Sequence, residues 1–276
     1  MTQTQSTETH TRGISLELDS AELAATYDET STRQFNHGKV LIASLAPQPG
    51  ERVLDVGCGT GRLGEYVANL VAPSGEVQGV DPLALRIELA ARKNPRFHAH
   101  VGRAEDLGAF AAASFDIVYS NSVFHWVRDK PGALREALRV LKPGGRIGIN
   151  SADADRPHQS AALVREAVLE EGLDIAEASA FGTNYRVSGP ALRQLLQAAG
   201  FERVNVVAHT FVDDVSGADD LVAWSTSSSF GNFLSELNPE QLQRVKARLQ
   251  QKLEARRIAG VIKLERYLVF ATAFRA

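Results

Sequence analysis

Cysteine and long apolar runs are scarce in this chain of 276 residues, and each scarcity excludes a class of protein. Cys58 is the one cysteine, so neither a disulfide within the chain nor a multi-cysteine zinc site can form. No run of about 18 apolar residues occurs, so the sequence predicts no membrane-spanning helix. We therefore expect a cytoplasmic protein without a metal site and without a membrane partner.

The chain also has no large excess of positive or of negative charge. Lys and Arg total 30 against 33 for Asp and Glu, which gives a formal net charge of −3. Proteins that bind a phosphate backbone usually carry a basic excess, so nucleic acid is not an expected partner. Hydrophobic residues make up 44% of the chain, enough for a large core. We expect a flexible polar tail over residues 1–18 and a single domain over residues 19–276.

Strands and helices alternate through the first half of the chain. Short apolar runs with the length of buried strands lie at 52–56, 76–80, 97–101, 115–120 and 146–150. Helical patterns lie between most of these runs. Such an alternation predicts an α/β fold in which helices cover both faces of a parallel sheet.

The second half of the chain has two strand patterns, at 203–211 and 264–274, and two helical stretches, at 153–187 and 214–258. The helical stretches carry aromatic side chains at Phe181, Tyr185, Trp224, Phe230 and Phe233. An aromatic lining suits a small and partly apolar ligand. The same side chains suit the internal packing of the helices equally well.

The sharpest motif is the segment VLDVGCGTG at 53–61, which follows the first predicted strand. Its three glycines allow a tight turn and let a ligand approach the backbone. A nicotinamide dinucleotide fingerprint requires glycine at position 62, where this chain has Arg62. Asp55 would also repel a pyrophosphate. The motif therefore favours a nucleotide-like ligand that carries a positive charge, and it disfavours a dehydrogenase.

Asp81 lies at the end of the second predicted strand, twenty residues after Gly61. A carboxylate at this place can accept hydrogen bonds from both hydroxyls of a ribose. Alternatively, Asp81 caps a helix that begins at Pro82, because Asp followed by Pro is a frequent helix start. The two roles are compatible, and the sequence leaves both open.

Five ordered segments resemble class I S-adenosylmethionine-dependent methyltransferases. They are VLDVGCGTG, GVDP, GRAEDL, FDIVYSNSVFHWV and LKPGGR, all within residues 48–150. The resemblance implies a Rossmann-like, seven-stranded sheet whose last strand runs antiparallel, with 203–211 and 264–274 as its final pair. It also implies that the helical stretches at 153–187 and 214–258 form lids over the sheet, and that S-adenosylmethionine is the cofactor.

The resemblance also implies a set of cofactor-binding residues. They are Asp55, Gly57, Cys58, Gly59, Thr60, Gly61, Asp81, Pro82, Leu83, Ala104, Glu105, Asn121 and Tyr27. In this scheme Asp55 and the glycine loop hold the methionine end, which Asn121 adjoins, and Asp81 holds the ribose. Residues 82–83 flank the adenine, and residues 104–105 contact its edge.

Two of these assignments have alternatives. Relatives often carry an acid where this chain has Arg103, so the contact to the adenine amino group passes either to Glu105 or to backbone groups. Tyr27 resembles residues that fold over the cofactor, and packing within its own helix is an equal alternative.

His125 is the candidate general base, since it follows the fourth predicted strand at the edge where open α/β sheets bind ligands. An imidazole with a pKa near ~6.5 can take a proton from a hydroxyl, an amine or an acidic carbon. The alternative is a histidine that hydrogen-bonds locally and shapes the pocket. Cys58 lies between two loop glycines, where a small side chain that fits is a better explanation than a nucleophile.

The resemblance predicts methyl transfer from S-adenosylmethionine to a small organic acceptor. The FHWV stretch at 124–127 resembles segments of methyltransferases that esterify carboxylates. A carboxylate or hydroxyl acceptor is therefore favoured, while oxygen, nitrogen and carbon nucleophiles all stay open, as does the oligomeric state. The alternative is a cofactor-binding protein or cyclase on the same fold that no longer transfers the methyl group.

Overall fold

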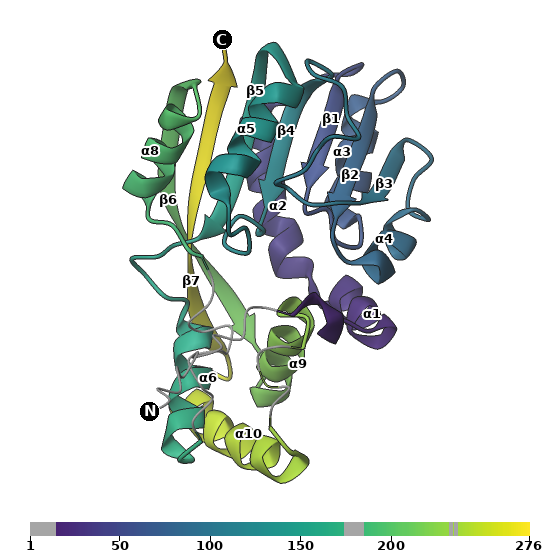
Figure 1. Cartoon of the computed structure of the whole chain (residues 1–276). Coiled ribbons are helices and arrows are strands. Elements are labelled where there is room, and N and C mark those ends of the chain that lie inside the picture. The colour runs from purple at the N-terminus through teal and green to yellow at the C-terminus, as the bar shows by residue number, and fades with distance from the viewer. Residues whose placement is uncertain (1–14, 174–184, 232–233, 235–236) are drawn as a thin grey trace, which may run out of the picture.

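The structure, a computed structural model, describes residues 15–173, 185–231, 234 and 237–276. The described strands form a seven-stranded sheet in the order β3-β2-β1-β4-β5-β7-β6 (Figure 1). They are β1 (Arg52–Val56), β2 (Glu76–Asp81), β3 (Phe97–Val101), β4 (Phe115–Asn121), β5 (Leu141–Ala152), β6 (Phe201–Val215) and β7 (Ile262–Arg275). Strands β1 to β5 pair in parallel, and β7 runs antiparallel to both of its neighbours. The predicted α/β sheet with an antiparallel last strand is confirmed.

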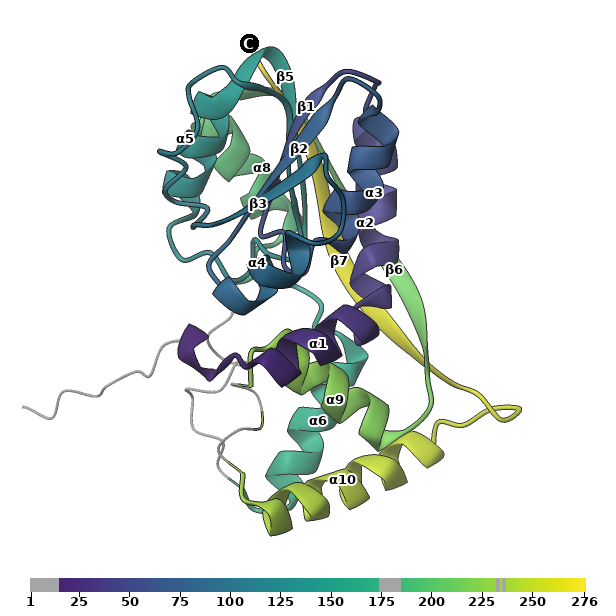
Figure 2. The ribbon, with the colours of Figure 1, turned by 90° about the vertical axis from the view of Figure 1, so that its right-hand side faces the viewer.

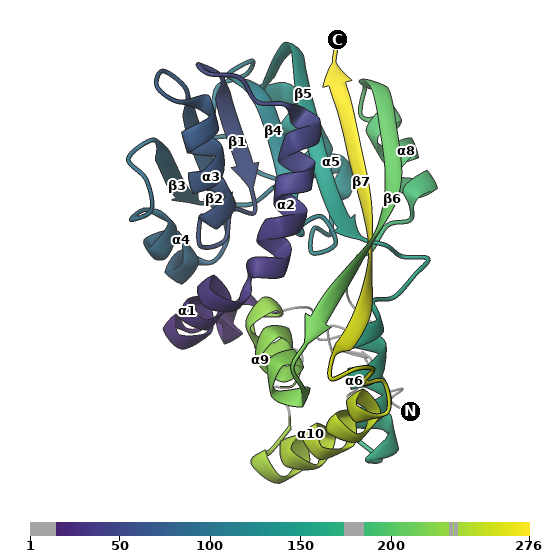
Figure 3. The ribbon, with the colours of Figure 1, turned by 180° about the vertical axis from the view of Figure 1, so that it is seen from behind.

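Helices cover both faces of the sheet (Figure 3). One face carries α2 (Thr32–Leu45), α3 (Arg62–Val71) and α4 (Ala84–Ala90), and the other carries α5 (Lys130–Val140) and α8 (Gly189–Ala198). In α3 the apolar residues recur at helical spacing, so that Leu63, Val67 and Val71 are all buried. The Asp129 side chain accepts a hydrogen bond from the Gly132 N–H at 2.9 Å and caps the start of α5.

Strands β6 and β7 are longer than the sequence pattern predicted. Their ladder runs from Phe201 opposite Arg275 to Val215 opposite Ile262. Asp213 and Asp214 disfavour a strand on propensity, but Asp213 bonds Arg266 at 2.7 Å and Asp214 bonds Lys263 at 2.9 Å on the partner strand. These cross-strand ion pairs extend the ladder beyond the predicted ends.

The far ends of β6 and β7 reach a second layer of helices below the sheet (Figure 2). It contains η1 (Leu16–Leu18), α1 (Ala21–Thr30), α6 (Gln159–Glu170), α9 (Ala218–Ser228) and α10 (Pro239–Glu254). We call α6, α9 and α10 the carboxyl-edge helices, because the parallel strands end on their side. They share a core of their own with the ends of β6 and β7.

The predicted helical stretches correspond to α6 and to α9 with α10, while residues 174–184, Phe233 and Phe181 lie outside the described residues. Their action as lids stays a prediction. The predicted tail lies outside the described residues up to position 14, and Leu16–Leu18 form η1. Over the described residues, no helix has the length and apolar character needed to cross a bilayer.

Candidate active site

The loop between β1 and α3 turns on three glycines. Gly57, Gly59 and Gly61 have φ of 83°, 52° and 83°, in the left-handed region that most side chains disfavour. A Cβ added to Gly57 would lie 2.2 Å from Cγ2 of Val123. The Gly57 N–H donates to the Val80 carbonyl at 2.7 Å. The loop is therefore fixed against the end of β2 and cannot accept a larger residue at position 57 without displacing Val123.

Asp81 ties this loop to the segment that follows β2. Its Oδ2 accepts the Gly59 N–H at 3.0 Å, and its Oδ1 accepts the Leu83 N–H at 3.0 Å. Burial raises the pKa of Asp81, and the two N–H donors oppose that rise. Helix α4 begins at Ala84 with Leu83 at its N-cap. The alternative prediction that Asp81 caps a helix starting at Pro82 is therefore wrong, and Asp81 instead bridges two loops.

Asp55 is a second buried acid at the end of β1. The Tyr119 hydroxyl donates to its Oδ2 at 2.7 Å. The pKa of Asp55 is raised to about 7, because burial and, to a lesser extent, the charge of Asp81 outweigh the opposing effect of the Tyr119 donor. Within the described residues, neither acid forms an ion pair. Two buried carboxylates therefore lie close together under the glycine loop, and the charge of Arg86 is among the causes that oppose the rise in the pKa of Asp81.

A cavity of about 410 Å³ lies between the carboxyl edge of the sheet and the carboxyl-edge helices. The predicted site residues that line it are Tyr27, Gly57, Gly59, Asp81, Pro82, Leu83, Ala104, Glu105 and His125. A smaller cavity of about 40 Å³ shares Tyr27 and Gly57 with it and is also lined by Asp55, Cys58, Thr60 and Asn121. Gly61 lines neither of these two cavities, because it packs against Phe97 and Ala90.

His125 lines the main cavity just after β4. Its Nδ1 accepts the Ala152 N–H at 3.4 Å and lies 3.4 Å from the Ser151 hydroxyl. Burial foremost, together with the charges of Arg186 and Lys130, lowers the pKa of His125 to about 3. Because Nδ1 accepts a backbone N–H, the neutral ring carries its proton on Nε2. Near neutral pH the free ring nitrogen of His125 is thus a hydrogen-bond donor.

Cys58 is buried in the loop. Burial raises the pKa of its thiol well above the ordinary value, and the charges of Asp55 and Asp81 raise it further. The thiol therefore stays protonated near neutral pH, which is unfavourable for a nucleophile.

Comparison with known proteins places this site in a family. Residues 54–149 match the family described as "Methyltransferase domain". The chain is 28% identical over 222 residues to trans-aconitate 2-methyltransferase of Deinococcus radiodurans, an alignment that covers 78% of this chain and 83% of that protein. The chain is a class I S-adenosylmethionine-dependent methyltransferase.

Two further relatives extend the comparison. The methyltransferase is 29% identical over 256 residues to nocamycin O-methyltransferase of Saccharothrix syringae, with 87% of this chain and 91% of that protein covered. Its fold matches the solved structure of Haemonchus contortus phosphoethanolamine N-methyltransferase 2 in complex with S-adenosyl-L-methionine. That match has a TM-score of 0.58 at 18% identity and covers 93% of this chain and 57% of that one.

The methyltransferase brings polar residues to the main cavity that its sequence did not single out. They are Gln34, Arg86, His158, Arg186 and Arg266, with Trp224 named earlier only for its ring. These residues belong to no motif, and they lie on elements that are far apart in the sequence. Only the folded chain brings them together.

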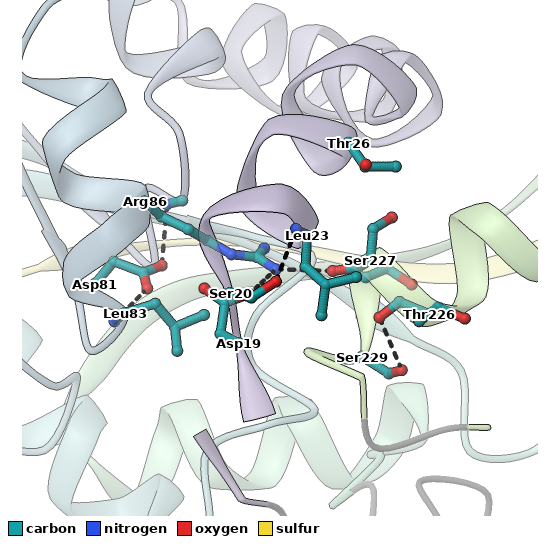
Figure 4. A network of polar contacts seen from close by, with 12 residues as sticks. Asp19, Ser20, Leu23, Thr26, Asp81, Leu83, Arg86, Thr226, Ser227 and Ser229 are labelled. Atoms are coloured by element: carbon teal, nitrogen blue, oxygen red, sulfur yellow. Dashed lines mark hydrogen bonds and ion pairs between the residues drawn. The ribbon is translucent and has the colours of Figure 1, made fainter. Parts of the chain in front are cut away.

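Arg86 of the methyltransferase, which lines the main cavity, joins three segments (Figure 4). Its guanidinium donates to the Asp19 carboxylate at 3.2 Å and to the Ser227 carbonyl at 2.7 Å. It also lies over the Tyr27 ring, 4.2 Å from the centroid, and over the Phe230 ring at 4.9 Å. Helix α4 is thereby connected to the segment before α1 and to the end of α9.

Proposed function

We propose that the protein transfers the methyl group of S-adenosylmethionine to an oxygen atom of a small organic acceptor, with a carboxylate favoured over a hydroxyl. The observation that carries the proposal is a main cavity with buried Asp81 at one end and a donor-rich wall at the other, together with buried Asp55 in the adjoining small cavity. Both relatives with broad coverage are named for methyl transfer, one of them to trans-aconitate and the other to oxygen.

The acids and the loop fit the cofactor. Buried carboxylates without a counter-ion favour a cationic ligand, and the methionine end of the cofactor is cationic. Asp55 faces the small cavity, where a positive charge would offset the burial of its carboxylate. Asp81 keeps lone pairs free beside its two N–H donors and can accept ribose hydroxyls. We assign Pro82 and Leu83 to the adenine, and Ala104 with Glu105 to its edge.

When bound, S-adenosylmethionine supplies an electrophilic methyl group on a positively charged sulfur. Transfer to an acceptor oxygen would form a carbon–oxygen bond as the carbon–sulfur bond broke, with the electron pair left on the sulfur. The protein's part is to align the acceptor oxygen and to exclude water, and alignment alone can lower the barrier by roughly 7–11 kcal/mol.

The state of His125 favours an acceptor that needs no base. A neutral hydroxyl must lose a proton on methylation, whereas a carboxylate is already ionised near neutral pH. His125 offers a proton donor at Nε2 and has a pKa of about 3. It is therefore poorly suited to accept a proton and well suited to hold an acceptor oxygen.

The test uses the cofactor labelled in its methyl group, with sets of carboxylic acids, phenols and alcohols as acceptors. We expect label in the acids, and mild alkali should release it as methanol, because methyl esters hydrolyse under conditions that leave methyl ethers intact. Calorimetry with S-adenosylhomocysteine is the parallel measurement. Absence of binding would refute the assignment of the cavity. Binding without transfer to any acceptor would favour the alternative of a non-transferring protein.

Asp81→Asn is the matching variant for the cofactor site. Loss of the charge-assisted hydrogen bonds should weaken S-adenosylhomocysteine binding by about 2 kcal/mol. Glu88→Gln removes an acid from the exposed side of the adjoining helix α4 and serves as the control. If the two variants bind alike, Asp81 does not hold the ribose.

A further inference from the structure

The wall of the main cavity remote from the glycine loop is lined by hydrogen-bond donors. His158 precedes α6, Arg186 precedes α8, and Trp224 lies in α9. With His125, these residues surround the part of the cavity between the sheet and the carboxyl-edge helices. The charges of Asp55 and Asp81, at the cofactor end, are not among the causes that shift the pKa values of His125 and His158.

Both histidines are fixed as neutral donors. The Nδ1 of His158 accepts the Tyr267 N–H at 3.2 Å, as that of His125 accepts the Ala152 N–H. Burial lowers the pKa of His158 well below its ordinary value, and neighbouring positive charges act in the same direction. Each ring therefore carries its proton on Nε2, the nitrogen left for a ligand.

Arg186 is the charge in this group that lacks a counter-ion. No carboxylate in the described parts of the chain pairs with it, and its buried Nε has no hydrogen-bond partner there. Arg266 also lines the cavity, but Asp213 bonds it at 2.7 Å. The buried Nε1–H of Trp224 likewise lacks a partner. Arg186 is half-buried, and a buried guanidinium N–H without an acceptor is costly in a folded protein unless a ligand supplies one.

We propose that Arg186, with His125 and His158 beside it, is the recognition site for a carboxylate on the methyl acceptor. The inference rests on the proposed function and names its substrate class, a small organic acid in its ionised form. A guanidinium matches a carboxylate with two parallel N–H donors, and the imidazole Nε2–H groups can bond the remaining lone pairs. The acceptor thus takes the place of a counter-ion that the described residues do not provide.

The experiment measures binding apart from transfer. Calorimetry measures the affinity of the protein for benzoate, cinnamate and succinate and for the amide of each acid. Each measurement is made with and without saturating S-adenosylhomocysteine. We expect the acids to bind the wild-type protein and the neutral amides to bind at least about 10-fold more weakly, since a charged partner is worth more than a neutral one. Equal binding of acids and amides, or no binding of any acid, would overturn the proposal.

Variants then assign the site. Arg186→Gln should weaken acid binding by about 10- to 100-fold and leave amide and S-adenosylhomocysteine binding unchanged. Arg186→Lys should restore part of the affinity, because it keeps the charge and loses the paired donors. Arg165→Gln, an exposed change on α6, is the charge-matched control. If Arg186→Gln binds acids as the control does, Arg186 is not the recognition residue.

The two proposals fail separately in this design. Acids that bind without any binding of S-adenosylhomocysteine would count against the cofactor assignment and leave the Arg186 site supported. Binding of S-adenosylhomocysteine with no preference for acids over amides would support the cofactor assignment and count against the Arg186 site.

Discussion

At the scale of single residues, we expect Asp55 to make cofactor binding depend on pH. Its pKa of about 7 in the free protein reflects burial foremost. A cation placed beside the carboxylate would lower that pKa, so binding would release a proton. S-adenosylhomocysteine, whose amino group is positive, should bind up to tenfold more weakly for each pH unit below about 7 and level off above it. Calorimetry in buffers of different ionisation enthalpy measures both the affinity and the proton release.

The matched variant is Asp55→Asn, which keeps an acceptor for the Tyr119 hydroxyl. Above neutral pH this variant should bind S-adenosylhomocysteine more weakly than the wild-type protein does. Its affinity should also no longer fall as the pH is lowered below about 7. A wild-type affinity that stays flat from about pH 5 to 8 would mean that Asp55 does not face the cation.

At the scale of the element, the β1–α3 loop depends on Gly57 for two separate reasons. The residue has φ of 83°, and a Cβ there would lie 2.2 Å from Val123. Gly57→Ala should therefore cost about 3 kcal/mol in the free energy of unfolding, as strain and overpacking add. Gly144 has φ of 76° with nothing within 4 Å of its Cβ position, so Gly144→Ala should cost only about 1 kcal/mol. Urea denaturation compares them, and equal losses would contradict the role of the Val123 contact.

Elements differ in how far the sequence predicted them. The five parallel strands were recoverable because each is a short apolar run next to a turn, and the Asp129 cap of α5 has a local signature. The ends of β6 and β7 were missed, because ion pairs such as Asp213 with Arg266 stabilise a ladder that propensity argues against. Arg186 was missed for a related reason, since the absence of a counter-ion among the residues that the structure describes is a property of the folded cavity and leaves no trace in the local sequence.

At the scale of the whole molecule, the sheet and the carboxyl-edge helices are joined beside the cavity through Arg86. The side chains of Arg86 and Asp19 are only 3% and 4% exposed, so their ion pair is shielded from water. The pair connects α4, at the sheet, with the segment before α1, and the Ser227 carbonyl adds the end of α9. We therefore expect the junction between the two layers beside the cavity to depend on this one buried guanidinium.

Arg86→Met should destabilise the protein by about 3 kcal/mol, because it leaves the Asp19 carboxylate buried without a partner. The double variant with Asp19→Asn should regain part of that loss, since no unpaired charge remains. Arg52→Met breaks a pair whose side chains are 45% and 37% exposed and should cost under about 1 kcal/mol. Urea denaturation gives the three values, and hydrogen exchange should show faster opening of α1 and α9 in Arg86→Met alone. If Arg86→Met and Arg52→Met lose equal stability, or if exchange in α1 and α9 is unchanged, the Arg86 pair does not hold the two layers together.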